Sequence, residues 1–95
     1  MDHASLMELA RHAAEQVAGP ESVREVEVEP GVDGSDRPVY FFSFQIDQDR
    51  ARQRPGLILT RLVQRLRDDL AARRDERLPV IRILSPEDWG KRASA

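Results

Sequence analysis

The chain has 95 residues, of which 40% are hydrophobic, 34% are charged and none is cysteine. This length fits one small domain, and the lack of cysteine excludes disulfides, thiolate metal sites and thiol nucleophiles. The net charge of -2 gives no overall signal for nucleic acid or a membrane surface. No apolar run approaches the roughly 20 residues of a membrane span, and residues 1–11 lack a signal-peptide pattern, so we expect a cytoplasmic protein.

An N-terminal helix is predicted to begin near Ser5 and to end at Gly19-Pro20. Ser5 and Glu8 have the spacing of a capping box, and a Gly-Pro pair stops a helix. The apolar residues between them recur at helical spacing and include several alanines. They are Leu6, Leu9, Ala10, Ala13 and Val17.

Two strands follow, joined by a turn-rich loop. From Ser22 to Glu29, valines alternate with glutamates, which is typical of a strand with one solvated face. The segment from Val39 to Asp47 is the most apolar strand of the chain. One face of it carries Tyr40, Phe42, Phe44 and Ile46, and the other carries Val39 and Phe41, continued by Ser43, Gln45 and Asp47.

The longest predicted helix covers Leu57 to Glu76, and a strand from Val80 to Leu84 follows it. After that strand, Ser85-Pro86 has the N-cap and first-turn chemistry of a short helix that carries Trp89. The long helix has one broad apolar stripe. The stripe consists of Ile58, Leu59, Leu62, Val63, Leu66 and Leu70.

The element order is therefore α-β-β-α-β with a short C-terminal helix, and the predicted fold class is α+β. A helix joins the last two strands, so these run parallel if they share a sheet, and the crossover is right-handed. We expect a three-stranded mixed sheet with the long helix on one face. The second strand is apolar on both faces and is placed in the centre, although the order 2-1-3 also fits. We expect one domain over residues 1–95, with an ordered core over about 5–90 and a frayed tail over 91–95.

The predicted sheet has more apolar surface than the two helices cover. If both pack on one face, the other face exposes several apolar side chains, which forfeits several kcal/mol at about 25 cal/mol per Å². Either the first helix folds across that face or a second copy of the chain covers it. We favour a homodimer, although Trp89 also fits a role in packing against its own sheet. The candidate interface residues are Val39, Phe41, Val80, Leu84 and Trp89.

Charge is unevenly distributed along the chain. Residues 1–49 carry three basic and eleven acidic side chains, whereas residues 50–77 carry nine arginines and four acids. Arg50, Arg52 and Arg54 precede a helix start, where backbone N–H groups and the helix dipole favour an anion. Together with Arg61 and Arg65 they form a candidate anion or nucleic-acid site. The alternative is a solvated loop whose arginines pair with nearby acids.

If the segment Gln48 to Gln53 forms a further short helix before Arg54-Pro55-Gly56, the order resembles that of prokaryotic-type KH domains and of the ribosome-binding factor A family. The resemblance covers roughly Leu6 to Leu84 and lies in the α-β-β-α-α-β topology. It implies a nucleic-acid-binding domain, in which KH proteins use a G-x-x-G loop. Of that loop, only Gly56 is present here, with a proline before it.

Catalytic chemistry has little support in the sequence. Asp47 and Asp49 lie two residues apart at a strand end, where two carboxylates can hold a divalent cation, but the only lysine is the distant Lys91. Neither histidine has a triad-like serine partner. We therefore expect a non-catalytic interaction module that self-associates and uses no metal or cofactor. The alternatives are a nucleic-acid-binding domain and a metal-dependent hydrolase.

Overall fold

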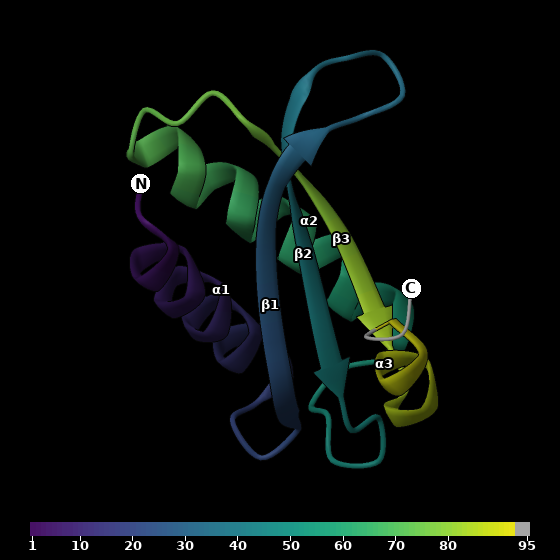
Figure 1. The fold of residues 1–95 in the computed structure, drawn as a ribbon. Helices are drawn as coiled ribbons and strands as arrows, with labels where there is room; N and C mark the ends of the chain where they lie inside the picture. Colours follow the sequence, from purple (N-terminus) through teal and green to yellow (C-terminus); the bar gives the residue numbers. More distant parts are fainter. Residues whose placement is uncertain (93–95) are drawn as a thin grey trace.

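The computed structural model describes residues 1–92 and confirms the predicted α+β class (Figure 1). The elements are α1 (His3–Ala18), β1 (Val23–Val32), β2 (Pro38–Ile46), α2 (Pro55–Ala72), β3 (Leu78–Leu84) and α3 (Pro86–Arg92). Of the predicted frayed tail over residues 91–95, residues 91 and 92 form the end of α3, and residues 93–95 lie outside the described residues. None of the helices within residues 1–92 is long and apolar enough to cross a membrane.

The strand β2 occupies the centre of the three-stranded sheet, in the order β1-β2-β3. It pairs antiparallel with β1 and parallel with β3, so the sheet is mixed, as expected. The helix α2 forms the crossover between the two parallel strands. The alternative order 2-1-3 is therefore excluded.

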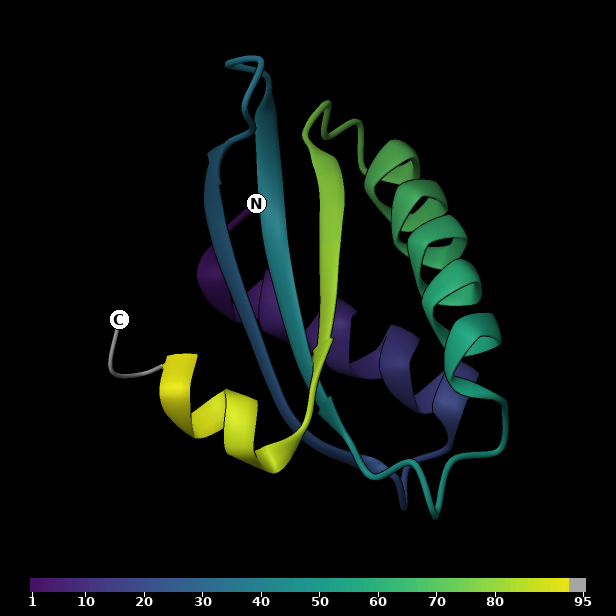
Figure 2. The ribbon, with the colours of Figure 1, turned by 90° about the vertical axis from the view of Figure 1, so that its right-hand side faces the viewer.

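Both long helices pack on the same face of the sheet, and α3 lies on the opposite side (Figure 2). Alternate residues of the strands, such as Val28, Phe42 and Phe44, point towards α1 and α2 and are fully buried. The helix α2 buries the stripe Ile58, Leu62, Leu66 and Leu70, each at most 1% exposed. The main core thus lies between two helices and one face of the sheet.

The helix α1 begins earlier than predicted. Its N-cap is Asp2, whose Oδ1 accepts a 2.7 Å hydrogen bond from the backbone N–H of Ser5. The capping box at Ser5 and Glu8 was therefore the wrong start, because an acceptor three residues upstream already caps the helix. The alanine face is fully buried, which lets α1 pack closely on the sheet. This face consists of Ala10, Ala13, Ala14 and Ala18.

The boundaries of the hairpin and of the loop before α2 also differ from the predictions. The strand β1 continues through Pro30 and Gly31, which pair with Tyr40 and Val39 although we expected them in the loop. An edge strand tolerates proline because one side of its backbone needs no partner. The segment 48–53 forms turns and bends, and not the short helix on which the KH-like order depends. The helix α2 ends at Ala72, before the predicted end, and Arg74 then adopts a φ of 58°.

Candidate interaction surface

We call the sheet face opposite α1 and α2 the open face. Its three strands differ in character, and the pairing register brings them into rows. The edge strand β1 is acidic, the central strand β2 is mixed, and β3 is apolar apart from one arginine. The open-face residues are Glu25, Glu27, Glu29 and Gly31 on β1, Val39, Phe41, Ser43 and Gln45 on β2, and Leu78, Val80, Arg82 and Leu84 on β3.

The chain itself covers part of the open face. Val39, one of the candidate interface residues, is only 1% exposed, so its side chain offers almost no surface to a partner. It lies in register between Gly31 and Leu78, and the ring of Phe41 leans over Gly31, where an added Cβ would come within 2.6 Å of the ring. The missing side chain at Gly31 therefore makes room for Phe41.

The other four candidate interface residues remain partly exposed. Phe41, Val80, Leu84 and Trp89 are all half-buried. The helix α3 turns back from the end of β3 towards the open face (Figure 2), and α1 stays on the opposite face. The N-terminal helix therefore does not cover these residues.

A groove runs over the open face between β1 and α3. Glu29 and Phe41 line it on one side, and Leu84 and Lys91 line it on the other. Ser43 also lines the groove, is only 4% exposed, and makes no side-chain hydrogen bond within residues 1–92. A group entering the groove would therefore meet one unsatisfied hydroxyl.

The strand β3 is the least covered apolar element of the fold. Five of its seven residues are apolar, yet every residue of β3 is at least partly exposed. Leu78 is 42% exposed, and Val80, Ile81 and Ile83 are half-buried. The central strand β2 is the opposite case, since most of its residues are buried. The apolar surface predicted from the sequence is thus concentrated at one edge of the sheet.

The structure does not bring the five candidate arginines into one site. Arg50 and Arg52 lie in the loop and pair with acids, at 3.6 Å from Asp47 and 3.9 Å from Glu21. Arg65 pairs with Asp69 at 3.2 Å on α2. These three arginines therefore follow the alternative in which nearby acids neutralise them.

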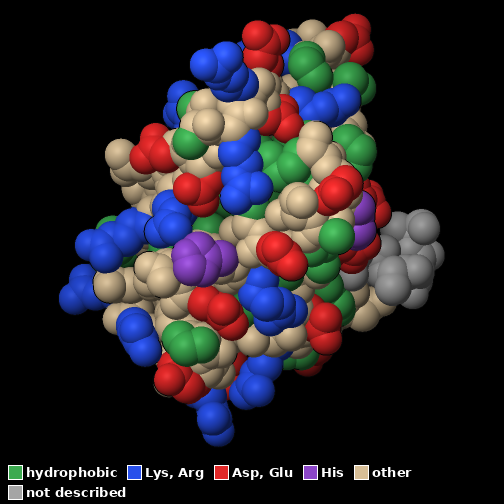
Figure 3. Space-filling model, turned by 90° about the vertical axis from the view of Figure 1, so that its left-hand side faces the viewer, with side chains coloured by type: hydrophobic (Ala, Val, Ile, Leu, Met, Phe, Trp, Pro, Cys, Tyr) green, Lys and Arg blue, Asp and Glu red, His purple; other side chains and the backbone are tan. Residues whose placement is uncertain are grey.

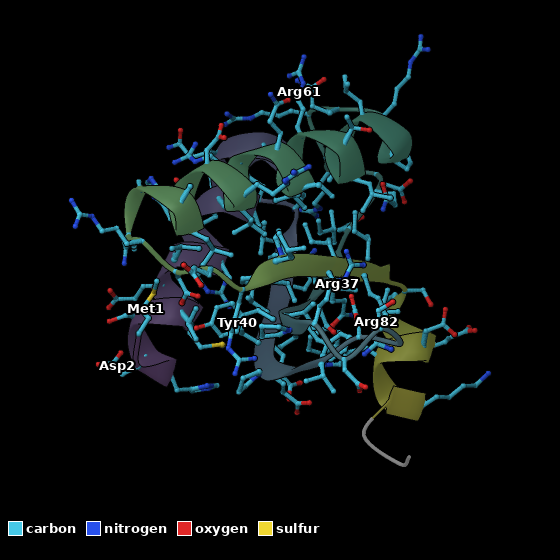
Figure 4. The ribbon with its side chains drawn as sticks, turned by 90° about the horizontal axis from the view of Figure 1, so that it is seen from above. Met1, Asp2, Arg37, Tyr40, Arg61 and Arg82 are labelled. Atoms are coloured by element: carbon cyan, nitrogen blue, oxygen red, sulfur yellow. The ribbon has the colours of Figure 1, made fainter. Side chains whose placement is uncertain are left out.

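Arg54 and Arg61 form no ion pair within the described part of the chain and are exposed. Seen from the α1 side, arginines gather on the margin where α2 lies, and acidic side chains are interspersed among them (Figure 3). Arg61 projects away from the sheet, whereas Arg82 lies on the opposite side of β3, near α3 (Figure 4). The basic side chains therefore do not converge on one pocket.

The carboxylate of Asp47 is held by protein groups, and Asp49 contributes its backbone N–H to it. Asp47 Oδ2 accepts a 3.0 Å hydrogen bond from Arg24, and Asp47 Oδ1 accepts a 3.1 Å bond from the backbone N–H of Asp49. The Arg24 guanidinium lowers the pKa of Asp47 and keeps it ionised. Within residues 1–92, no group of three or more His, Cys, Asp or Glu side chains is placed to hold a metal ion. Asp47 thus works as a turn cap and an ion-pair partner.

A polar cluster that sequence reasoning missed lies where β3 begins. The hydroxyl of Tyr40 donates a 2.6 Å hydrogen bond to Asp75 Oδ2, and the guanidinium of Arg77 lies 5.4 Å from the centre of the Tyr40 ring. Arg77 also donates to the backbone oxygens of Gly31 and Val39 at 2.9 and 3.0 Å. A tyrosine in a core strand was the available signal, since a buried phenol needs a hydrogen-bond partner.

This cluster shifts two titrations. Burial raises the pKa of Asp75, but the hydrogen bonds from Tyr40 and from the backbone N–H of Arg77 outweigh it and leave that pKa lowered. The bond to ionised Asp75, followed by burial, raises the pKa of Tyr40. The cluster fastens β1, β2 and the start of β3 to one another. Its role is structural.

Comparison with models of known protein families, with curated proteins and with solved structures gives no match.

Proposed function

We propose that this chain is a small non-catalytic interaction module that associates with a second copy of itself. The observation that carries the proposal is the incomplete burial of β3, in which every apolar residue is at least partly exposed. Leaving several such side chains in water costs several kcal/mol at about 25 cal/mol per Å². A second copy recovers this free energy and uses surface that the fold leaves uncovered.

A metal-dependent hydrolase has weaker support. A hydrolase around Asp47 would need a carboxylate available to a metal, and Asp47 is bound to Arg24 and lies 3.6 Å from Arg50. Calorimetry with Mg²⁺ and Mn²⁺ should therefore show no saturable heat of binding. Saturable binding that Asp47→Asn removes would restore the hydrolase.

Light scattering at increasing protein concentration tests the self-association. The chain has a mass of 10.8 kDa, and we expect a molar mass that rises towards twice this value. A molar mass that stays at the monomer value up to near-millimolar concentration refutes the proposal.

Nucleic-acid binding is the second candidate, and one observation favours it. Arg54, the N-cap of α2, and Arg61 form a row on one side of the helix, since they lie seven residues apart. If this row binds RNA or DNA, the affinity is measurable at low salt and falls steeply as salt rises, and Arg54→Ala with Arg61→Ala flattens that dependence. Absence of binding to single-stranded and duplex RNA and DNA at low salt rejects this candidate.

A further inference from the structure

We propose that the second copy docks edge to edge, with β3 of each chain pairing antiparallel to β3 of the other, so that two three-stranded sheets form one continuous six-stranded sheet. This inference rests on the proposed self-association and specifies its surface.

The outer edge of β3 is open. It is the last strand of the sheet, so one side of its backbone has no neighbouring strand within residues 1–92. Figure 2 looks onto this edge, and no helix or loop crosses in front of β3. Its side chains are apolar on both faces, since Val80 and Leu84 lie on the open face and Ile81 and Ile83 on the helix face. An exposed edge of this kind is a template for a further strand.

The outer edge of β1 has three of the features that prevent strand addition. A bulge shifts its register between Val23 and Glu25, Pro30 lacks an N–H, and glutamates occupy its open face. The strand β3 also contains Pro79 and Arg82, but its register with β2 has no bulge and five of its seven residues are apolar, so it is the edge better suited to a partner strand. Pairing at β3 leaves a β1 edge at each end of the six-stranded sheet, so assembly stops at two copies.

The flank of α2 beside this edge is also apolar and exposed. Arg65 and Asp69 line the groove between α1 and α2, so they mark the side of α2 that faces α1. At about 100° per residue, Leu59 and Val63 lie on the other side of the buried stripe. Because α1 packs over β1 and α2 packs over β3, that side of α2 faces the open edge. Leu59 is 41% exposed there.

This flank favours a folded copy over an isolated peptide strand. A peptide added to β3 would cover the backbone edge but would bring no helix to cover Leu59 and Val63. A second copy brings its own α2 on the same face of the sheet, because a two-fold axis perpendicular to the sheet keeps helix faces together. The two flanks of α2 then approach each other across the axis.

The sequence of β3 is compatible with itself in antiparallel register. With Ile81 on the axis, Ile81 meets its own copy, and Leu78 lies opposite Leu84 of the second copy. Val80 lies opposite Arg82 of the second copy, so the aliphatic stem of the arginine covers the valine. The two Arg82 side chains are diagonal neighbours, about 7 to 8 Å apart at the backbone. Salt that screens this repulsion should tighten the dimer.

Single cysteines test the register, since the natural chain contains no cysteine. Residues directly opposite in antiparallel strands have Cα atoms about 4.5 to 5.5 Å apart, which a disulfide spans. We expect Ile81→Cys to form a covalent dimer under mild oxidation at high yield. Glu29→Cys, on the edge strand β1, is the matched control and should stay monomeric on a denaturing gel.

A second pair of variants tests the helix flank without disturbing the core. Leu59→Lys and Leu57→Lys change residues of α2 with similar exposure, 41% and 39%. Leu59 faces the open edge, whereas Leu57 points away from the sheet, about 160° further round the helix. We expect Leu59→Lys to weaken the dimer at least tenfold by light scattering and Leu57→Lys to leave it unchanged.

The outcomes separate this inference from the proposed function. A monomeric wild type refutes both. If the wild type is a dimer, but the Phe41→Cys variant forms a covalent dimer and the Ile81→Cys variant does not, the edge pairing is overturned. That result indicates a dimer formed between open faces. A dimer that weakens as salt rises also contradicts edge pairing, because this register brings no opposite charges together. Cross-linking at position 81 together with loss of the dimer in Leu59→Lys supports it.

Discussion

Replacing Tyr40 by phenylalanine removes one hydroxyl and keeps the ring that packs in the core. That hydroxyl donates a 2.6 Å hydrogen bond to Asp75 and lies on a side chain that is only 5% exposed. The ring contacts with Phe42 and Arg77 do not need the hydroxyl. The substitution therefore isolates one hydrogen bond to a carboxylate.

The size of the effect follows from this geometry. Hydrogen bonds to charged groups contribute about 1.5 to 3 kcal/mol, but Asp75 is only half-buried, so water replaces part of the lost bond and we expect about 1 to 2 kcal/mol. For a domain of this size, that corresponds to a fall in Tm of about 5 to 15 °C. The free energy of unfolding, measured with urea at pH 7, gives the value directly.

The same variant has a predicted pH dependence. The pKa of Asp75 is lowered in the folded protein, so its contribution is present above the unfolded value of about 3.9 and is lost as pH falls through the lower folded pKa. Tyr40→Phe removes a bond that lowers this pKa, so the pKa of Asp75 should rise. The stability difference between wild type and variant should shrink as pH falls towards 3.

A double-mutant cycle with Asp75→Ala provides the control, because alanine has no group that accepts the bond. If the bond is the cause, Tyr40→Phe costs much less in the Asp75→Ala background than in wild type. Equal costs in both backgrounds, or a cost that does not change between pH 7 and pH 3, would refute the reasoning.

Three further predictions concern packing, backbone conformation and acid stability. Leu66→Ala should lower the free energy of unfolding by about 3 to 5 kcal/mol, because Leu66 is fully buried. Leu57→Ala is the control and should change it by less than about 1 kcal/mol. Equal changes for the two variants in urea denaturation would contradict the assigned core. Gly19→Ala should destabilise the chain by more than about 1 kcal/mol, since Gly19 has a φ of 94° and an added Cβ would meet Arg52 at 2.9 Å. Gly34→Ala is the control and should be tolerated. A Tm that does not change in Gly19→Ala would show that the turn can relax. Stability should fall as pH drops from 5 towards 2, because Arg24 lowers the pKa of Asp47 and backbone N–H groups lower the pKa of Asp33. In urea titrations, Asp47→Asn should reduce this change of unfolding free energy with pH. An unchanged pH dependence in the variant would exclude Asp47 as a contributor.

Local patterns in the sequence were enough to predict the class of the fold. The alternation of valine and glutamate in β1 and the leucine stripe of α2 have periods that only a half-buried strand and an amphipathic helix satisfy. The parallel pairing of β2 with β3 followed from the helix between them. These features depend on neighbours within a few residues or on the connectivity of the chain.

The boundaries were less predictable because they depend on competing local partners. Asp2 caps α1 in place of Ser5, and Pro30 and Gly31 extend β1 because β2 offers them a pairing partner. The burial of Val39 was missed for a related reason. Val39 lies in register between Gly31 and Leu78 of the neighbouring strands, and no periodicity within β2 reports that pairing.

The candidate surface was also predicted only in part from the sequence. Its composition came from the sequence, since the apolar residues of β3 are visible there, but its location at one open edge of the sheet required the strand order and the positions of α1 and α2. The sequence did not reveal which acids pair with Arg50 and Arg52, because those ion pairs depend on which carboxylates the folded loop brings close.

The sequence alone determined the periodicity, the element order and the excess of apolar surface, because these are properties of residues close together along the chain. The tertiary structure decided which edge of the sheet stays open, which arginines are neutralised and where Tyr40 finds Asp75. Those outcomes depend on distances between residues far apart in sequence, and such distances exist only once the chain has folded.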